Sequence, residues 1–413
     1  MIGANRLVDA ASGTRTTWAE LPPVAPAYPA AYPVALVVGS GFEALPAVAA
    51  HAATGAELLV VAAGRVDEAL AAELRTSGFG LVDAAGTASP PPSVRAGERG
   101  RLWLLTSGST GRPKRIGHTL ASLTTVTGAL PPRTWLCPYS PGTYAWWQVV
   151  TLGLTVPGQD LVMVDPAAED WLAPALEHGV TAVSGTPTFW RRSLLTLGEE
   201  LARLPLEQVT LGGEPVDQAV LDQLRAVFPA ARISWIYASS EVGASIVVHD
   251  GRAGFPLDWL DRETPDRPRL SVEGGELVIA SPHHGTDPSG RRLAGPVRTG
   301  DAVRIEDGRV LITGRLDRDE INVGGAKVSA GEVRGVLQSH PGVGWAAVRG
   351  RRAPLVGTVV VADVVPAAPV EFTADFAAEV SRWAAERLPE YAVPRRITVL
   401  PEIPVKETLK SDV

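Results

Sequence analysis

Cysteine is almost absent from this 413-residue sequence, and basic residues are in the minority. The single cysteine, Cys137, excludes an internal disulfide and a zinc site built from several thiolates, so we expect a reducing, cytoplasmic setting. The 38 Lys and Arg residues against 45 Asp and Glu residues leave a formal charge of −7. This balance argues against a nucleic-acid partner, because phosphate contacts need a basic surface.

Long apolar runs that could form a membrane span are also missing. Residues 21–42 are uncharged and long enough to cross a bilayer, but five prolines interrupt them and would break a helix. The first nine residues contain Arg6 and Asp9 and lack an apolar core of the length that an export signal needs. We therefore expect neither a membrane span nor a signal peptide.

Short apolar runs alternate with helical stretches up to about residue 254. The expected strands are residues 34–38, 58–61, 80–83, 102–105, 182–184, 208–211 and 233–237. The expected helices include residues 43–53 and 66–76. Because strand and helix alternate, the pattern predicts an α/β fold in which the strands are parallel.

Hairpins replace this alternation beyond residue 254. Two strands are expected at residues 276–280 and 309–313, the second directly after an Asp307-Gly308 turn. Ser329 and Glu332 have the spacing of a capping box, which starts a helix that runs to about residue 340. The last expected elements are strands at 345–349, 358–365 and 396–400 and a helix at 373–388. The C-terminal part therefore has the pattern of a small α+β domain.

Residues 106–114, Thr-Ser-Gly-Ser-Thr-Gly-Arg-Pro-Lys, carry the strongest chemical pattern in the chain. The two glycines let the backbone approach an anion, the four hydroxyls and the free N–H groups can donate to phosphate oxygens, and Lys114 adds positive charge. The segment is not a Walker loop, because Arg-Pro-Lys follows Gly111. The alternative is a flexible Ser/Gly linker, but a linker rarely follows an apolar strand and ends in a lysine that lies on a helix, as we expect here. The pattern therefore predicts phosphate binding.

This segment resembles the phosphate loop of the adenylate-forming superfamily, which contains acyl- and aryl-CoA synthetases, nonribosomal-peptide adenylation domains and firefly luciferase. Further segments resemble motifs of that family in the family's order: residues 212–215, 237–241, 298–301, 314–317 and 324–325. Lys410, six residues after Pro404, lies where the family has its catalytic lysine. The order and approximate spacing hold from about residue 35 to the last residues. The chain is thus identified as a shortened member of this superfamily.

The resemblance implies a role for each matching residue. Tyr237 would stack on the adenine ring, Asp301 and Arg315 would hold the ribose, and Glu241 would hold Mg²⁺. Lys410 would stabilise the negative charge that builds between the attacking carboxylate and the α-phosphate. The catalytic residues would be Lys410, Lys114 and Glu241. The ATP- and AMP-binding residues would be Thr106, Ser107, Gly108, Ser109, Thr110, Gly111, Gly212, Gly213, Glu214, Tyr237, Ser240, Asp301 and Arg315.

The resemblance also implies a division into two domains. A large N-terminal domain of sheets flanked by helices would cover residues 1–315, and a small, mobile C-terminal α+β domain would cover residues 316–413. Asp317 would be the hinge, and rotation about it would withdraw Lys410 and present the Gly324-Gly325 loop to the second half-reaction. The part before Thr106 is shorter than in relatives, and Leu409 replaces the glycine that usually precedes the lysine.

Aromatic residues gather where the family binds its acid. Residues 134–190 hold five of the eleven tryptophans, and the candidate pocket residues are Tyr139, Tyr144, Trp146 and Trp147. This clustering favours an aromatic or bulky apolar acid, although core packing is an equal alternative for any one of them. Residues 139–147 lack an acidic residue of the kind that holds a substrate α-amine. Cys137 and all the histidines, among them His118, are interpreted as structural or solvated.

The predicted activity is ATP- and Mg²⁺-dependent conversion of a carboxylic acid to an acyl-AMP, followed by transfer to the thiol of coenzyme A or of a carrier protein's phosphopantetheine arm. One alternative keeps the adenylation but uses an amine or nitrite as acceptor, in specialised metabolism. Another is a non-catalytic protein that binds nucleotide or acyl-adenylate. The sequence leaves the acid, the acceptor and the oligomeric state open, a homodimer included.

Overall fold

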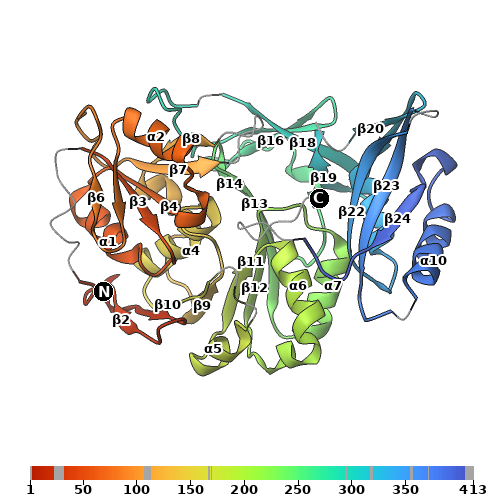
Figure 1. The fold of residues 1–413 in the computed structure, drawn as a ribbon, viewed down its shortest axis with the longest axis horizontal. Coiled ribbons are helices and arrows are strands. Elements are labelled where there is room, and N and C mark those ends of the chain that lie inside the picture. The colour runs from red at the N-terminus through yellow and green to blue at the C-terminus, as the bar shows by residue number, and fades with distance from the viewer. Residues whose placement is uncertain are drawn as a thin grey trace.

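Five sheets organise the chain in a computed structural model that describes residues 2–22, 32–106, 113–165, 168, 170–293, 295–316, 320–353, 357–370 and 372–404. A six-stranded sheet lies at the N-terminal end, an eight-stranded sheet occupies the middle, and the C-terminal strands β22 to β24 lie at the opposite end (Figure 1). In the described chain, no helix combines the length and the apolarity that crossing a bilayer requires.

The six-stranded sheet has the predicted parallel core. Its strand order is β6-β5-β3-β4-β7-β8. The strands are β3 (Val34–Val38), β4 (Leu58–Ala62), β5 (Gly80–Asp83), β6 (Ala88–Ser89), β7 (Leu102–Thr106) and β8 (Lys114–His118), and the helices are α1 (Leu45–Thr54) and α2 (Glu68–Thr76). Helix α2 begins two residues later than predicted, because the Asp67 side chain accepts a hydrogen bond from the Leu70 amide and caps the helix there.

The expectation that Lys114 lies on a helix is wrong. Lys114 starts strand β8, which pairs antiparallel with β7 so that Thr106 lies opposite Lys114 and Leu104 opposite Ile116. The residues after Lys114 are an arginine, the β-branched Ile116, Gly117 and His118, and the last three are buried at the edge of the sheet. Burial against the sheet therefore determines the structure of this segment.

The eight-stranded sheet also has a parallel centre. Its order is β14-β13-β12-β11-β9-β10-β1-β2, and the two edge strands β2 and β14 are antiparallel. The strands are β1 (Arg6–Asp9), β2 (Arg15–Thr17), β9 (Arg133–Cys137), β10 (Gln159–Met163), β11 (Ala182–Gly185), β12 (Gln208–Gly212), β13 (Arg232–Ser239) and β14 (Gly243–Val248). The helices are α3 (Leu120–Leu123), α4 (Tyr144–Thr155), α5 (Leu172–Glu177), α6 (Pro187–Leu197) and α7 (Gln218–Val227).

One hydrophobic core joins these two sheets. Leu36 and Leu104 of the six-stranded sheet belong to the same buried cluster as Leu161 of the eight-stranded sheet and Trp146 and Trp147 of α4. The carboxyl ends of the parallel strands in such sheets are where α/β proteins place their ligand sites. Strands β12 and β13 therefore deliver the predicted nucleotide-binding segments to one edge of the sheet.

Antiparallel hairpins form the next sheet, as predicted. Its order is β15-β19-β18-β17-β16, with β15 (Phe255–Pro256), β16 (Arg269–Glu273), β17 (Glu276–Ala280), β18 (Val297–Glu306) and β19 (Arg309–Arg315). The predicted turn between β18 and β19 has φ values of 46° at Asp307 and 71° at Gly308, which suit a two-residue hairpin loop.

The C-terminal part has a hydrophobic core of its own. The elements are β20 (Glu320–Val323), β21 (Ala326–Ser329), α9 (Ala330–Gln338), β22 (Val343–Ala353), β23 (Gly357–Pro366), α10 (Thr373–Ala385) and β24 (Arg396–Val399). Val333 and Leu337 of α9 pack with Val364 of β23 and Val380 of α10. Ser329 caps α9 as predicted, accepting a hydrogen bond from the Glu332 amide at 3.1 Å. The short 3₁₀ helices are η1 (Ile2–Ala4), η2 (Ala63–Arg65), η3 (Gly198–Arg203), η4 (Leu257–Trp259) and η5 (Glu390–Ala392).

A buried arginine joins this C-terminal part to the rest of the chain. Arg191 of α6, which is 3% exposed, contacts Asp217 Oδ2 at 2.5 Å through Nη2 and donates to the Gly344 carbonyl of β22 at 3.1 Å through Nη1. A side chain at Gly344 would collide with Leu195, whose Cδ2 atom would lie 2.6 Å from the added Cβ. The division at residues 315 and 316 stays a prediction, and the hinge candidate Asp317 lies outside the described residues.

Candidate active site

Three predicted nucleotide-binding residues meet at one place in the structure. Tyr237, in β13, donates its phenol hydrogen to Asp301 Oδ2 at 2.5 Å, across 64 residues of sequence. Arg315, at the end of β19, has Nη1 3.3 Å from Asp301 Oδ1 and 2.7 Å from the Thr299 carbonyl oxygen. The cluster therefore combines an aromatic ring, a carboxylate and a half-exposed guanidinium.

Burial governs the electrostatics of this cluster. Loss of hydration raises the pKa of Asp301 above its usual value, although the bond from Tyr237 and the charge of Arg315 act against the rise. Burial and the negative charge of Asp301 raise the pKa of Tyr237 well above its usual value. Tyr237 therefore stays a phenol at neutral pH and acts as a hydrogen-bond donor.

Glu241 lies in the turn between β13 and β14. The side chain is half-buried, and its negative charge contributes to the raised pKa of Asp301, which places the two carboxylates in one site. Among the described residues, no group of three or more His, Cys, Asp or Glu side chains could hold a metal ion. A Mg²⁺ ion needs no such cage, because it is commonly held by one or two carboxylates together with substrate phosphates and water. Glu241 fits that role.

The phosphate-binding segment connects β7 to β8. Thr106 ends β7 and donates from Oγ1 to the Lys114 carbonyl oxygen at 3.4 Å, and the Lys114 side chain is exposed. The connecting residues Ser107, Gly108, Ser109, Thr110 and Gly111 lie outside the described residues. Lys410, predicted to be the catalytic lysine, also lies outside them.

Glu214 has a structural partner that the sequence did not indicate. Its carboxylate accepts hydrogen bonds from the Thr188 amide at 2.9 Å and the Thr188 hydroxyl at 3.0 Å, at the N-terminus of α6. A carboxylate stabilises that end of a helix. Gly212 ends β12 and Gly213 follows it, and the nucleotide-binding role of Gly212, Gly213 and Glu214 stays a prediction.

The four candidate pocket residues divide into two kinds. Trp146 and Trp147 are 0% exposed and pack edge to face with ring centroids 5.0 Å apart, so in this structure they are core residues. Tyr139 is also buried, with its hydroxyl 3.1 Å from Ser184 Oγ. Tyr144 lies on the site side of α4, where its hydroxyl accepts a hydrogen bond from the Ala244 amide at 2.9 Å. Tyr144 is therefore the strongest of the four candidates.

Cys137 and His118, both expected to be structural or solvated, are both buried. Cys137 is fully buried, and burial raises the pKa of its thiol to about 12, so it is a core residue and no nucleophile. His118 is buried too, but its Nε2 atom lies 2.7 Å from the Ser240 carbonyl oxygen, next to Glu241. Its position four residues after Lys114 is near the predicted phosphate-binding segment, but the sequence gives no sign of the contact with Ser240.

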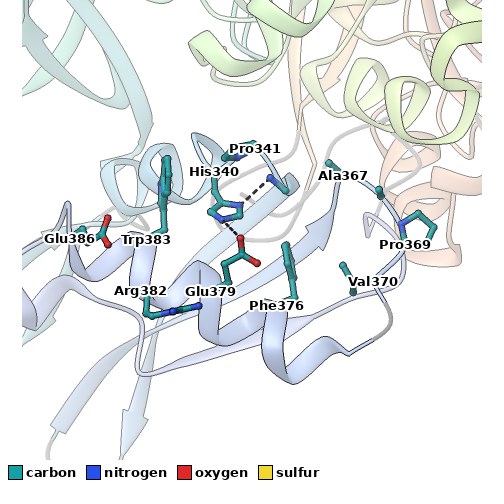
Figure 2. Close-up of a pocket in the computed structure, with 12 residues that line it drawn as sticks. His340, Pro341, Ala367, Pro369, Val370, Phe376, Glu379, Arg382, Trp383 and Glu386 are labelled. Atoms are coloured by element: carbon teal, nitrogen blue, oxygen red, sulfur yellow. Dashed lines mark hydrogen bonds and ion pairs between the residues drawn. The ribbon is translucent and has the colours of Figure 1, made fainter.

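A groove of about 590 Å³ lies on the C-terminal part, between the end of α9 and helix α10 (Figure 2). His340 donates from Nε2 toward Glu379 at 3.3 Å and accepts at Nδ1 from the Gly342 amide at 3.0 Å. Phe376 and Trp383 face the same histidine ring edge-on. Among the predicted site residues that the structure describes, none lines this groove.

Comparison with known proteins decides the family. Residues 31–286 match the AMP-binding enzyme family, and residues 332–410 match the C-terminal domain of AMP-binding enzymes. The chain belongs to the AMP-binding enzyme family. Its predicted place in the adenylate-forming superfamily is thereby confirmed.

This AMP-binding enzyme has relatives among CoA ligases. It is 27% identical over 343 residues to the acetyl-coenzyme A synthetase of Rubrobacter xylanophilus, which covers 73% of this chain and 53% of that protein. It is 30% identical over 267 residues to a 4-chlorobenzoate–CoA ligase of Arthrobacter sp., which covers 60% of this chain and 49% of that protein. The chain thus spans about half the length of these curated relatives.

Solved structures match the AMP-binding enzyme over nearly its whole length. The anthranilate CoA ligase AuaEII in complex with anthranoyl-AMP superposes with a TM-score of 0.72 at 16% identity, covering 99% of this chain and 92% of that one. The amide bond synthetase McbA from Marinactinospora thermotolerans gives a TM-score of 0.71 at 21% identity, covering 99% and 96%. At these identities the likeness shows the fold, and it confirms the predicted α/β architecture with a large N-terminal and a smaller C-terminal domain.

Proposed function

We propose that this AMP-binding enzyme activates a carboxylic acid with ATP and then transfers the acyl group to a thiol. In the first step a carboxylate oxygen attacks the α-phosphorus, the bond to the bridging oxygen breaks, and pyrophosphate leaves. In the second step the thiolate sulfur attacks the acyl carbonyl and AMP leaves. The observation that carries this proposal is the cluster of Tyr237, Asp301 and Arg315, with Glu241 beside it.

The cluster is suited to binding the nucleoside. Asp301 can accept hydrogen bonds from two ribose hydroxyls, and its pairing with Arg315 and Tyr237 fixes the carboxylate before the nucleotide arrives. The half-buried ring of Tyr237 offers a flat surface to the adenine. These residues hold the nucleoside and leave the triphosphate to the segment between β7 and β8.

Positive charge is supplied at the phosphates. Lys114, exposed at the start of β8, would meet the phosphate oxygens, and Glu241 would hold Mg²⁺, which neutralises phosphate charge when bound. Lys410 would stabilise charge that develops only in the transition state of adenylation. The hinge at Asp317 and the Gly324-Gly325 loop would then serve the thiol-transfer step.

An aromatic or bulky apolar acid is the proposed substrate. Tyr144, whose hydroxyl contacts the Ala244 amide three residues after Glu241, supports this, as do relatives whose names specify 4-chlorobenzoate and 2-succinylbenzoate. The buried Trp146 and Trp147 add no argument for it. The proposed acceptor is coenzyme A or a carrier protein's phosphopantetheine arm, in the cytoplasm. A homodimer is compatible with this proposal.

Hydroxamate trapping tests this proposal and identifies the acid. The protein is incubated with ATP, Mg²⁺, hydroxylamine and one acid from a panel of aryl, fatty and amino acids. Aryl acids are expected to give hydroxamate, and release of AMP is expected to rise when coenzyme A replaces hydroxylamine. Hydroxamate formation without thiol-dependent release of AMP, together with AMP release on addition of an amine or nitrite, would favour an amine or nitrite acceptor instead.

A further inference from the structure

His118 uses both nitrogens of a buried ring. The side chain is 2% exposed at the end of β8, with Nε2 2.7 Å from the Ser240 carbonyl oxygen and Nδ1 3.0 Å from Ser122 Oγ. A carbonyl oxygen can only accept, so Nε2 carries the hydrogen, while Nδ1 pairs with the Ser122 hydroxyl, which also lies 3.0 Å from the Thr119 carbonyl oxygen. A neutral imidazole therefore satisfies both partners.

A second segment holds the next carbonyl group of the same turn. The Gly285 amide donates to the Glu241 carbonyl oxygen at 3.0 Å, and Gly117 exchanges two backbone hydrogen bonds of 2.8 Å with Thr286. Position 285 has no room for a side chain, because an added Cβ would lie 2.4 Å from Ile116 Cγ2 and 3.2 Å from His118 Nε2. Strand β8, the turn and residues 285–286 are therefore packed together as one unit.

These two bonds restrain the backbone on both sides of Glu241. The Ser240 carbonyl belongs to the peptide group before the Glu241 Cα atom, and the Glu241 carbonyl belongs to the one after it. With both peptide groups held by hydrogen bonds, φ and ψ of Glu241 are restricted, and so is the direction in which its side chain leaves the backbone. His118 lies four residue steps along the extended strand from Lys114, a span of about 13 Å. Strand β8 thus runs from the support of this turn to Lys114.

We infer that His118 is a positioning residue for Glu241. By holding the Ser240 carbonyl group, His118 orients the Glu241 carboxylate toward the proposed Mg²⁺ site beside the phosphates. The inference rests on the proposed function, in which Glu241 holds Mg²⁺. Tyr144 contacts the strand that follows this turn: its hydroxyl accepts from the Ala244 amide of β14, and its ring lies edge-on to His118 with centroids 6.0 Å apart. The proposed Mg²⁺ site at Glu241 and the candidate acid pocket at Tyr144 are therefore both next to His118.

The test compares His118→Phe and His118→Gln with a matched control, His51→Phe. His51 is also buried, at 4% exposure, and its Nδ1 atom lies 2.6 Å from the Ala56 carbonyl oxygen, but it lies on α1 outside the site. Calorimetry measures ATP affinity with and without Mg²⁺. Amide hydrogen exchange at Val242 in the ligand-free protein reports on the turn itself, because this amide bonds to Ser239 Oγ inside it.

His118→Phe should reduce the gain in ATP affinity that Mg²⁺ provides by roughly 3- to 10-fold, the effect of losing one hydrogen bond. Its Mg²⁺-free ATP affinity should stay at the wild-type value, and exchange at Val242 should become faster. His118→Gln, which keeps an N–H donor, should recover most of the loss, and His51→Phe should match the wild type in all three measurements.

An unchanged Mg²⁺ effect in His118→Phe would overturn the inference, as would equal changes in His118→Phe and His51→Phe. If the wild type shows no Mg²⁺ effect on ATP affinity, the proposed function has failed instead. The exchange rate of the Val242 amide then decides alone. Faster exchange in His118→Phe, and in no other variant, would show that His118 stabilises the turn. Equal exchange in all variants would refute this.

Discussion

Acid should destabilise this protein in a pH range set by His118. Burial lowers the pKa of His118 from 6.5 to about 4; the bond to the Ser240 carbonyl opposes the decrease, and the charge of Arg101 adds to it. Since the folded-state pKa lies below the unfolded one, the unfolded chain takes up the proton first. The contribution to stability is therefore fully present above the unfolded pKa of 6.5 and is lost as the pH falls toward 4.

The size of the effect follows from the pKa difference. At 1.36 kcal/mol per pKa unit, the complete shift corresponds to about 3 kcal/mol of unfolding free energy, and about 2 kcal/mol of it is lost by about pH 5. Burial lowers the pKa of His51, His249 and His284 as well, so the whole protein should respond in the same direction. The difference between the wild type and His118→Gln isolates the contribution of His118.

Urea unfolding at about pH 8 and about pH 5 measures this difference. The wild type should lose about 2 kcal/mol more than His118→Gln between the two conditions. In a parallel NMR titration of the folded wild type, the His118 ring signals should stay unchanged as the pH passes through 6.5. Equal losses in the two proteins, or ring signals that move near pH 6.5, would refute the claim that His118 is held neutral by burial.

Three further substitutions test the site and the contact with the C-terminal part. Asp301→Ala should weaken ATP binding about 10- to 100-fold by calorimetry, because ribose hydroxyls lose their acceptor; unchanged affinity in a folded variant would remove this role. Lys410→Ala should slow acyl-AMP formation about 10²- to 10³-fold and leave ATP binding and thiol transfer from supplied acyl-AMP intact. Equal damage to both half-reactions would argue against the assignment. Arg191→Met breaks the bonds to Asp217 and Gly344, and should lower the free energy of unfolding by roughly 1–3 kcal/mol and expand the particle in X-ray scattering. Unchanged stability and scattering would show that this contact does not hold the two parts together.

The sequence pattern predicted helices and strands correctly where contacts between residues close in sequence determine them. The β-branched run at residues 34–38 forms β3 with the predicted bounds, and Ser329 caps α9 because its oxygen reaches the Glu332 amide within one turn. Both depend on neighbours in sequence. The helix expected at Lys114 was wrong, because the segment forms a strand through its pairing with β7 and its bridge from Gly117 to Thr286. The sequence pattern of the segment itself does not show these contacts.

The site was predictable as a set of residues but not as a set of contacts. The resemblance to the family assigns Tyr237, Asp301 and Arg315 to one nucleotide-binding site from the sequence alone. The role of His118 depends on Ser240, 122 residues away, and a lone histidine carries no sign of such a partner. Sequence also cannot separate a tryptophan that lines a pocket from one that fills a core, since both are apolar. Trp146 and Trp147 are of the second kind in this structure.

Exchange of labelled pyrophosphate into ATP tests the proposed adenylation most directly, because it occurs only if acyl-AMP forms reversibly. With an aryl acid and Mg²⁺, the wild type should incorporate label into ATP, and omission of the acid should abolish incorporation. Asp301→Ala and Lys410→Ala should lower the exchange rate strongly in the same assay. Tight ATP binding without exchange, for every acid in an aryl, fatty and amino acid panel, would contradict the proposed activity and identify a nucleotide-binding protein that does not catalyse adenylation.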